Sequence, residues 1–182
     1  MTQSRDSLIS LSDTPYYHCI SRCVRRAFLC GQDKYTGQSF EHRRQWVIDR
    51  VKYLTDVFPI EVCAYAIMSN HYHLVLFVNE DELANCSDSE ICERWGKIYS
   101  IPLVVQRWLK GESSSDIENN VAALEVIAKW RKRLSSISWF MRCLNEFIAV
   151  KANKEDKCKG RFWEGRFKSQ ALLDEKALLT CM

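Results

Sequence analysis

The sequence predicts an α+β domain with an antiparallel sheet. A β-rich run comes first, an amphipathic helix follows, and then two β-rich runs are joined by a two-residue turn before a series of helices. The chain has 182 residues, 47% of them hydrophobic and 27% charged, which is ordinary for one globular domain with its own core. We therefore expect a single domain over residues 1–182.

The first half of the chain shows each expected element in turn. Residues 15–24 are aromatic and β-branched after a proline, which predicts a strand. Residues 41–58 carry apolar side chains at helical spacing and end before Pro59, which predicts a helix. Residues 60–68 and 71–78 flank Ser69 and Asn70 and predict a β-hairpin. Both of these runs are apolar on both faces, which is typical of central strands.

The second half is predicted to be mainly helical. The acidic residues 79–90 predict a surface loop or the start of a helix, and residues 110–120 predict a polar loop. Residues 121–134 and 136–154 predict two helices. The apolar stripe of the second helix predicts core packing.

Composition excludes several classes of protein. No apolar run reaches the roughly 18 residues of a membrane span, and the N-terminus lacks the apolar core of a signal peptide. We therefore expect a cytoplasmic protein without a membrane partner. The nine cysteines are odd in number and form no Cys-x₂-Cys pair, which favours reduced thiols over disulfides or structural zinc.

Charge is distributed unevenly along the chain. Residues 22–50 and residues 151–168 each hold seven Lys and Arg against three Asp and Glu, whereas residues 80–93 hold six acidic residues and no basic one. This pattern fits a polyanion bound on one side of the molecule. Charge alone fits ordinary solvated surfaces equally well.

Two of the four histidines open the second run of the hairpin. Because side chains alternate along a strand, His71 and His73 lie on one face about 7 Å apart, and Tyr72 points to the other. Two imidazoles at this spacing can share a metal ion, but the spacing leaves ordinary strand histidines open as well. For His18, on the first strand, we expect a buried, hydrogen-bonded histidine.

Three blocks of the sequence resemble a known family. The blocks are YYHCISRCVRRAFLC at residues 16–30, AYAIMSNHYHLVLFV at 64–78 and GRFWEGRFKSQALLDEKALL at 160–179. They resemble the opening strand, the histidine–hydrophobic–histidine strand and the late glycine–aromatic–tryptophan block of the one-tyrosine single-strand DNA transposases. The most similar branch is that of the REP-associated tyrosine transposases. Residues 79–134 match nothing in the family and suggest an insertion.

The resemblance implies a fold and a chemistry. It implies a ferredoxin-like antiparallel sheet with helices packed on one face. It implies that His71 and His73 hold one Mg²⁺ or Mn²⁺ ion, with a third ligand from the final helix, and that the ion polarises a phosphate of single-stranded DNA beside a hairpin. A tyrosine hydroxyl would attack that phosphate, leaving a 5′-phosphotyrosine and a free 3′-hydroxyl. The resemblance also implies a homodimer.

The catalytic tyrosine of the family has no counterpart at its expected place. It belongs on the helix after the Trp163-Glu164-Gly165-Arg166 block, and no tyrosine follows that block. We therefore expect it beyond Met182, with the helix that bears it incomplete or absent. The side chain of Tyr72 points to the strand face opposite the histidines. Tyr16 or Tyr17 could approach the histidines only if the first strand neighbours the histidine strand.

Basic and aromatic residues give a prediction for the DNA contacts. Bases can stack on aromatic rings while Arg and Lys hold phosphates. The predicted DNA-binding residues are Arg22, Arg25, Arg26, Arg161, Trp163, Arg166 and Lys168. The alternative is that Phe162, Trp163 and Phe167 anchor a loop to the core and that the arginines lie on a solvated turn.

Two other functions stay open from the sequence. One is a non-catalytic protein that binds hairpin DNA or RNA. The other is a metal-dependent hydrolase that activates water at His71 and His73; this is the weakest hypothesis, because no carboxylate cluster accompanies the histidines.

Overall fold

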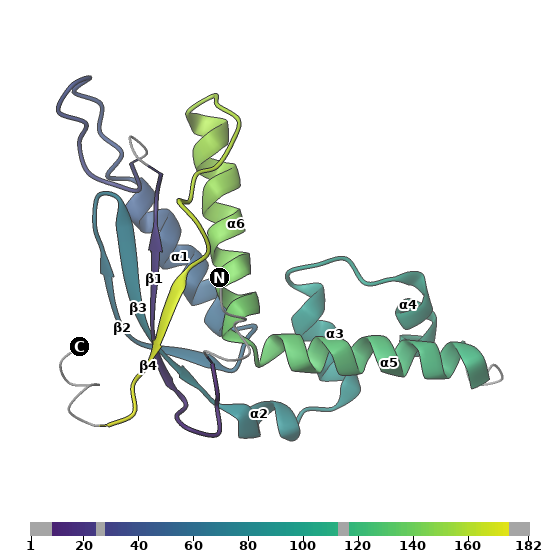
Figure 1. Cartoon of the computed structure of the whole chain (residues 1–182). Coiled ribbons are helices and arrows are strands. Elements are labelled where there is room, and N and C mark those ends of the chain that lie inside the picture. Colours follow the sequence, from purple (N-terminus) through teal and green to yellow (C-terminus); the bar gives the residue numbers. More distant parts are fainter. Residues whose placement is uncertain (1–8, 25–27, 113–116, 175–182) are drawn as a thin grey trace.

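A four-stranded antiparallel sheet, covered on one face by helices, organises the molecule in the computed structural model (Figure 1). The structure describes residues 9–24, 28–112 and 117–174. The strands are β1 (Tyr16–Arg22), β2 (Ile60–Ile67), β3 (His71–Val78) and β4 (Lys168–Ala171), in the spatial order β2-β3-β1-β4. This confirms the expected fold class. The four-residue β4 was not predicted, because a run of this length carries little periodic signal.

The described residues form six helices, and two of them cover the sheet. The helices are α1 (Arg43–Thr55), α2 (Glu80–Ala84), α3 (Asp88–Gly96), α4 (Leu103–Leu109), α5 (Ile117–Leu134) and α6 (Ile137–Glu155). α1 and α6 lie side by side on one face of the sheet (Figure 1). The β1-α1-β2-β3-α6-β4 framework has the connectivity of a ferredoxin-like fold.

Alternation along β1 and β3 separates a buried face from a partly exposed one. Tyr17, Cys19 and Ser21 of β1 are buried, as is Tyr72 of β3. Tyr72 donates its hydroxyl hydrogen to Oδ1 of Asn145 on α6, so this is the face beneath the helices. The histidines of both strands occupy the other face.

β2 lies at an edge of the described sheet, so the prediction of a central strand was wrong for this strand. It pairs with β3 alone among the described strands, with a register shift between Val62 and Ala64. Glu61, Cys63 and Tyr65 are exposed. An irregular register and a charged residue are common features of strands that border solvent, because both discourage pairing with another chain.

Residues 80–112 and 117–134 form a helical lobe that extends away from the sheet (Figure 1). Its core includes the stacked rings of Trp95 and Trp130, whose centroids are 5.4 Å apart. The acidic segment forms α2 and α3, and Ser87 caps α3 with a reciprocal bond to Glu90. The prediction of a polar loop at 110–120 was wrong for residues 117–120, because α5 begins at Ile117; residues 113–116 lie outside the described residues.

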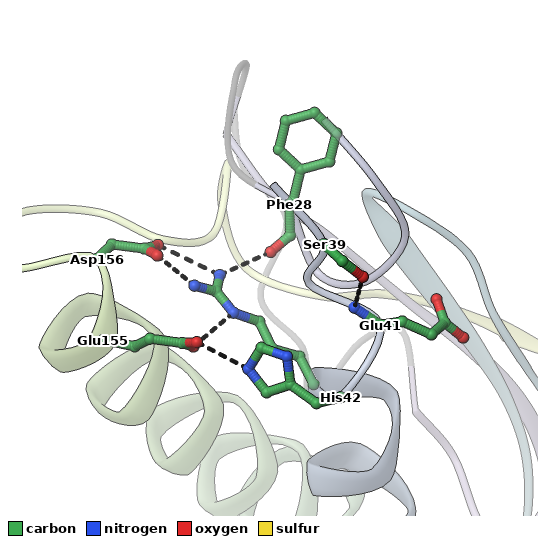
Figure 2. A network of polar contacts seen from close by, with 7 residues as sticks. Phe28, Ser39, Glu41, His42, Glu155 and Asp156 are labelled. Atoms are coloured by element: carbon green, nitrogen blue, oxygen red, sulfur yellow. Dashed lines mark hydrogen bonds and ion pairs between the residues drawn. The ribbon is translucent and has the colours of Figure 1, made fainter. Parts of the chain in front are cut away.

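Arg43 joins the start of α1 to the end of α6, where its partners Glu155 and Asp156 are labelled in Figure 2. Its side chain is completely buried, and its guanidinium bonds to Glu155, Asp156 and the carbonyl oxygen of Phe28. His42 contacts Glu155 as well. One arginine of the basic segment 22–50 is therefore an internal ion-pair partner and is withdrawn from any polyanion.

The described cysteines are all free. Burial raises the pKa of the Cys23 thiol to about 12, with Arg43 opposing the shift. A thiol of this kind stays protonated and is a poor metal ligand. Among the described helices, none combines the length and apolar character that a membrane crossing requires.

Candidate functional site

Three histidines meet on the partly exposed face of the sheet. Nε2 of His18 lies 2.8 Å from Nδ1 of His73, and the two rings stack with centroids 5.0 Å apart. The centroids of His71 and His73 are 5.1 Å apart. The antiparallel pairing of β1 with β3 brings about this cluster, because it aligns Ile20 with His73 and Arg22 with His71.

Each histidine of the pair on β3 has its Nδ1 atom engaged. Nδ1 of His71 lies 2.7 Å from Oδ1 of Asn70, and an amide oxygen only accepts, so the proton of His71 is on Nδ1. His73 has Nδ1 against His18. Among the described residues, no hydrogen bond engages Nε2 of His71 or His73. A metal-binding histidine commonly uses one ring nitrogen for the ion and the other for an orienting hydrogen bond.

The surroundings favour neutral imidazoles. Burial lowers the pKa of His71, and the neighbouring His73 and Arg22 lower it further. Burial also lowers the pKa of His18, with a second contribution from His73. A neutral ring keeps the nitrogen lone pair that binding to a metal ion requires.

A groove of about 510 Å³ runs beside the histidine pair. It is lined by His71 and His73 together with Ile20, Arg22, Glu164, Gly165, Arg166 and Lys168. Three cations and one carboxylate therefore border the histidines. A groove of this charge attracts a phosphate group.

Hydrogen bonds to the end of β1 hold the far wall of this groove. The amide of Glu164 donates to the carbonyl of Arg22 at 2.8 Å, and the amide of Val24 donates to Phe162. Phe162 and Phe167 are buried, so they anchor the segment to the core. The alternative that these aromatic residues serve the core is confirmed for the two phenylalanines.

A second groove of about 450 Å³ adjoins the first, and Gly165 and Arg166 line both. Trp139, Arg142 and Trp163 are among its other lining residues. The guanidinium of Arg142 lies 4.9 Å from the ring centroid of Trp139. Trp163 is half-buried and donates its indole N–H to the carbonyl of Asn145 at 2.8 Å. Together the two grooves form a basic and aromatic path away from the histidines.

The structure brings most of the predicted DNA-binding residues together. Arg22, Arg166 and Lys168 line the histidine groove, and Trp163 lines the second one. Arg161 is exposed but belongs to neither lining. Arg25 and Arg26 lie outside the described residues.

Glu164 lines the groove but was not among the predicted site residues. His18 is hydrogen-bonded, as expected, but it is only partly buried, and its partner is a histidine of the candidate site. The signal was present in the motif YYHCISR, where His18, Ile20 and Arg22 share one strand face. The sequence pattern did not show that this strand pairs with β3.

All seven tyrosines lie in the described part of the chain, and none of them lines the histidine groove. Tyr72 is fully buried on the opposite face, as predicted, and burial raises its pKa. β1 does neighbour β3, yet Tyr17 is buried beneath the helices and Tyr16 pairs with Phe77 at the far end of the strand. Tyr16 is four residues from Ile20, roughly 13 Å along the strand.

The donor set fits a divalent ion in part. His71 offers the lone pair of Nε2, and His73 offers its own when Nδ1 of His73 carries the hydrogen toward His18; imidazole is a common ligand of transition metals. No group of three or more His, Cys, Asp or Glu side chains that could hold a metal ion occurs within residues 9–24, 28–112 and 117–174.

Comparison with known proteins finds a likeness among solved structures. No protein-family model and no curated protein matches the chain. The structure is similar to one described as a REP-associated tyrosine transposase bound to a REP hairpin, with 13% sequence identity over 99% of this chain and 67% of that one. The TM-score is 0.44. This is the family that the sequence motifs resemble, and at this level the likeness concerns the arrangement of elements alone.

Proposed function

We propose that this chain is a transposase-type domain that binds single-stranded DNA beside a hairpin and holds one phosphate at His71 and His73. The observation that carries the proposal is the orientation of the histidine pair. Both Nδ1 atoms are engaged by hydrogen bonds, which leaves both Nε2 atoms for a ligand in a groove bordered by three cations.

A divalent metal ion fits the pair, and when bound it would act as a Lewis acid on a phosphate oxygen. His71 and His73 would hold it through Nε2. Two imidazoles suit Mn²⁺ better than Mg²⁺, because Mg²⁺ prefers oxygen ligands. Arg22, Arg166 and Lys168 would hold the flanking phosphates.

The path from the histidine groove to the second groove suits an unpaired strand. Its aromatic rings, Trp163 and Trp139, offer surfaces for unstacked bases, and Arg142 adds a cation. Contacts of this type determine the register and salt dependence of binding more than the choice of sequence. The helical lobe would be an insertion between β3 and α6.

A second candidate function is non-catalytic binding of hairpin DNA or RNA. The placement of the tyrosines favours it, because none of the seven lines the groove. The transposase function would need an attacking tyrosine other than these seven. The homodimer stays a prediction.

The test is binding of a labelled DNA hairpin with a single-stranded flank, with and without Mn²⁺. Wild type should bind more tightly with Mn²⁺ than without it. The double variant His71→Ala/His73→Ala should lose this metal-dependent gain and keep the metal-independent part, because the groove cations remain. His42→Ala is the matched control. His42 lies at the start of α1 and contacts Glu155 at the end of α6.

The same samples run on a denaturing gel separate the two candidate functions. Binding without a covalent adduct supports a nucleic-acid-binding domain that lacks its nucleophile. An adduct would show that one of the present side chains attacks the DNA. Equal binding by wild type and the double variant in Mn²⁺ would refute the role of the histidine pair.

A further inference from the structure

The contact between His18 and His73 joins two strands and two residues far apart in the chain. The nitrogen atoms are 2.8 Å apart and the stacked rings differ in plane by 19°. His18 lies on β1 between Gln170 of β4 and Val75 of β3. Its ring therefore sits at the centre of the sheet, supported by a strand on each side.

The contact admits two arrangements of protons. If Nδ1 of His73 carries the hydrogen, it donates to Nε2 of His18 and the lone pair of His73 is on Nε2. If Nε2 of His18 carries the hydrogen, Nδ1 of His73 accepts it, and a neutral His73 then has its own hydrogen on Nε2. Only the first arrangement lets His73 bind a metal ion through Nε2.

His71 provides an internal comparison. Its partner is an amide oxygen, which can only accept, so the hydrogen of His71 is on Nδ1 and its lone pair is on Nε2. Coordination of one ion through Nε2 of both residues requires the Nδ1–H tautomer at both. His18 faces Nδ1 of His73, as Asn70 faces Nδ1 of His71.

We propose that His18 is a positioning residue of the site, which accepts the Nδ1 hydrogen of His73 and so presents the Nε2 lone pair of His73 to the ion. This inference rests on the proposed metal-binding function. Metal-binding histidines are commonly oriented by an acceptor at the second ring nitrogen, and loss of that acceptor typically weakens metal affinity about 10–100-fold. Here the acceptor is another histidine instead of a carboxylate or carbonyl.

Two substitutions separate the hydrogen bond from the ring packing. His18→Phe keeps an aromatic ring against His73 and removes the acceptor. His18→Gln removes the ring and keeps an oxygen that can reach Nδ1. Gln170→Ala is the control for a change on the neighbouring strand, since Gln170 pairs with His18.

Two measurements on the full chain test the proposal. The first is the affinity for Mn²⁺ alone, by titration calorimetry or electron paramagnetic resonance. The second is the ¹⁵N spectrum of the metal-free protein, in which the two neutral tautomers of histidine give different shifts. We expect the Nδ1–H form of His73 in wild type, a partial change to the Nε2–H form in His18→Phe, and restoration in His18→Gln.

We expect Mn²⁺ affinity to follow the tautomer. His18→Phe should bind about 10–100-fold more weakly than wild type, and His18→Gln and Gln170→Ala should stay close to wild type. Wild-type affinity in His18→Phe, or equal losses in His18→Phe and His18→Gln, would overturn the positioning role while leaving the metal site intact. The Nε2–H form of His73 in the wild type would overturn it as well.

The two proposals fail in distinguishable ways. A wild type that binds no Mn²⁺ overturns the proposed metal function, and the positioning role with it. A wild type that binds Mn²⁺ regardless of residue 18 overturns the positioning role alone.

Discussion

At the scale of single residues, the candidate site depends on which ring nitrogens are engaged. Asn70 and His18 hold the Nδ1 atoms of His71 and His73. Burial on the sheet lowers the pKa of His18 and of His71, so the folded state favours their neutral forms. This preference makes the stability of the protein depend on pH.

We expect the free energy of unfolding to fall as the pH drops below the ordinary histidine value of 6.5. In that range the unfolded chain binds protons on His18 and His71 before the folded chain does, so protons favour unfolding. The loss should level off once the pH is below the lowered pKa values. Urea unfolding at a series of pH values above and below 6.5 measures it.

The double variant His18→Gln/His71→Asn lacks both titrating groups and should show a flatter profile in this range. A wild type with the same unfolding free energy on both sides of pH 6.5 would contradict the prediction. An unchanged slope in the double variant would assign the effect to other groups.

At the scale of elements, the ends of α1 and α6 are joined by a buried charge. Arg43 is fully buried, whereas Glu155 and Asp156 keep 31% and 28% of their side-chain area exposed. Removing a buried partner leaves the remaining charges and the Phe28 carbonyl without their donor. The joint stabilises the packing of the two helices that support the sheet.

Replacing Arg43 by an uncharged residue of similar length tests how much its ion pairs stabilise the protein. Arg43→Met should lower the free energy of unfolding by about 3 kcal/mol, at the lower end for broken buried pairs because the two carboxylates are partly solvated. Lys97→Ala, which removes an exposed pair with Glu93, should cost less than about 0.5 kcal/mol. Equal costs for the two variants in urea unfolding would contradict a structural role for Arg43.

At the scale of the whole molecule, the sheet face and the segment after α6 form one basic surface. Arg22 comes from β1, Arg166 from the segment before β4 and Lys168 from β4 itself. These residues are far apart in sequence, and the pairing of β1 with β4 brings them to one groove. Their joint effect should appear in the salt dependence of DNA binding.

We expect the logarithm of the binding constant to fall linearly with the logarithm of salt concentration. Each of Arg22→Ala, Arg166→Ala and Lys168→Ala should reduce the slope by about 0.7, because each removes one phosphate contact from a single strand. Fluorescence anisotropy of the labelled hairpin between about 50 and 200 mM salt measures the slope. Lys129→Ala, on the exposed side of α5 in the helical lobe, is the control and should leave the slope unchanged.

By itself, the sequence determined the local features. The apolar pattern predicted β1, the β2–β3 hairpin, α1, α5 and α6, and alternation placed His71 and His73 on one face. The patterns of strands and helices repeat about every two to four residues, so the sequence of a segment alone predicts its secondary structure. The short β4 and α4 had no such period and were missed.

Only the tertiary structure decided which strands are neighbours and which charges are buried. His18 meets His73 across 55 positions of sequence, and Arg43 meets Glu155 across 112. β2 is apolar in sequence but lies at the edge of the described sheet. The physical reason is that pairing and burial depend on how the whole chain packs around one core, and no periodicity within a segment records that arrangement.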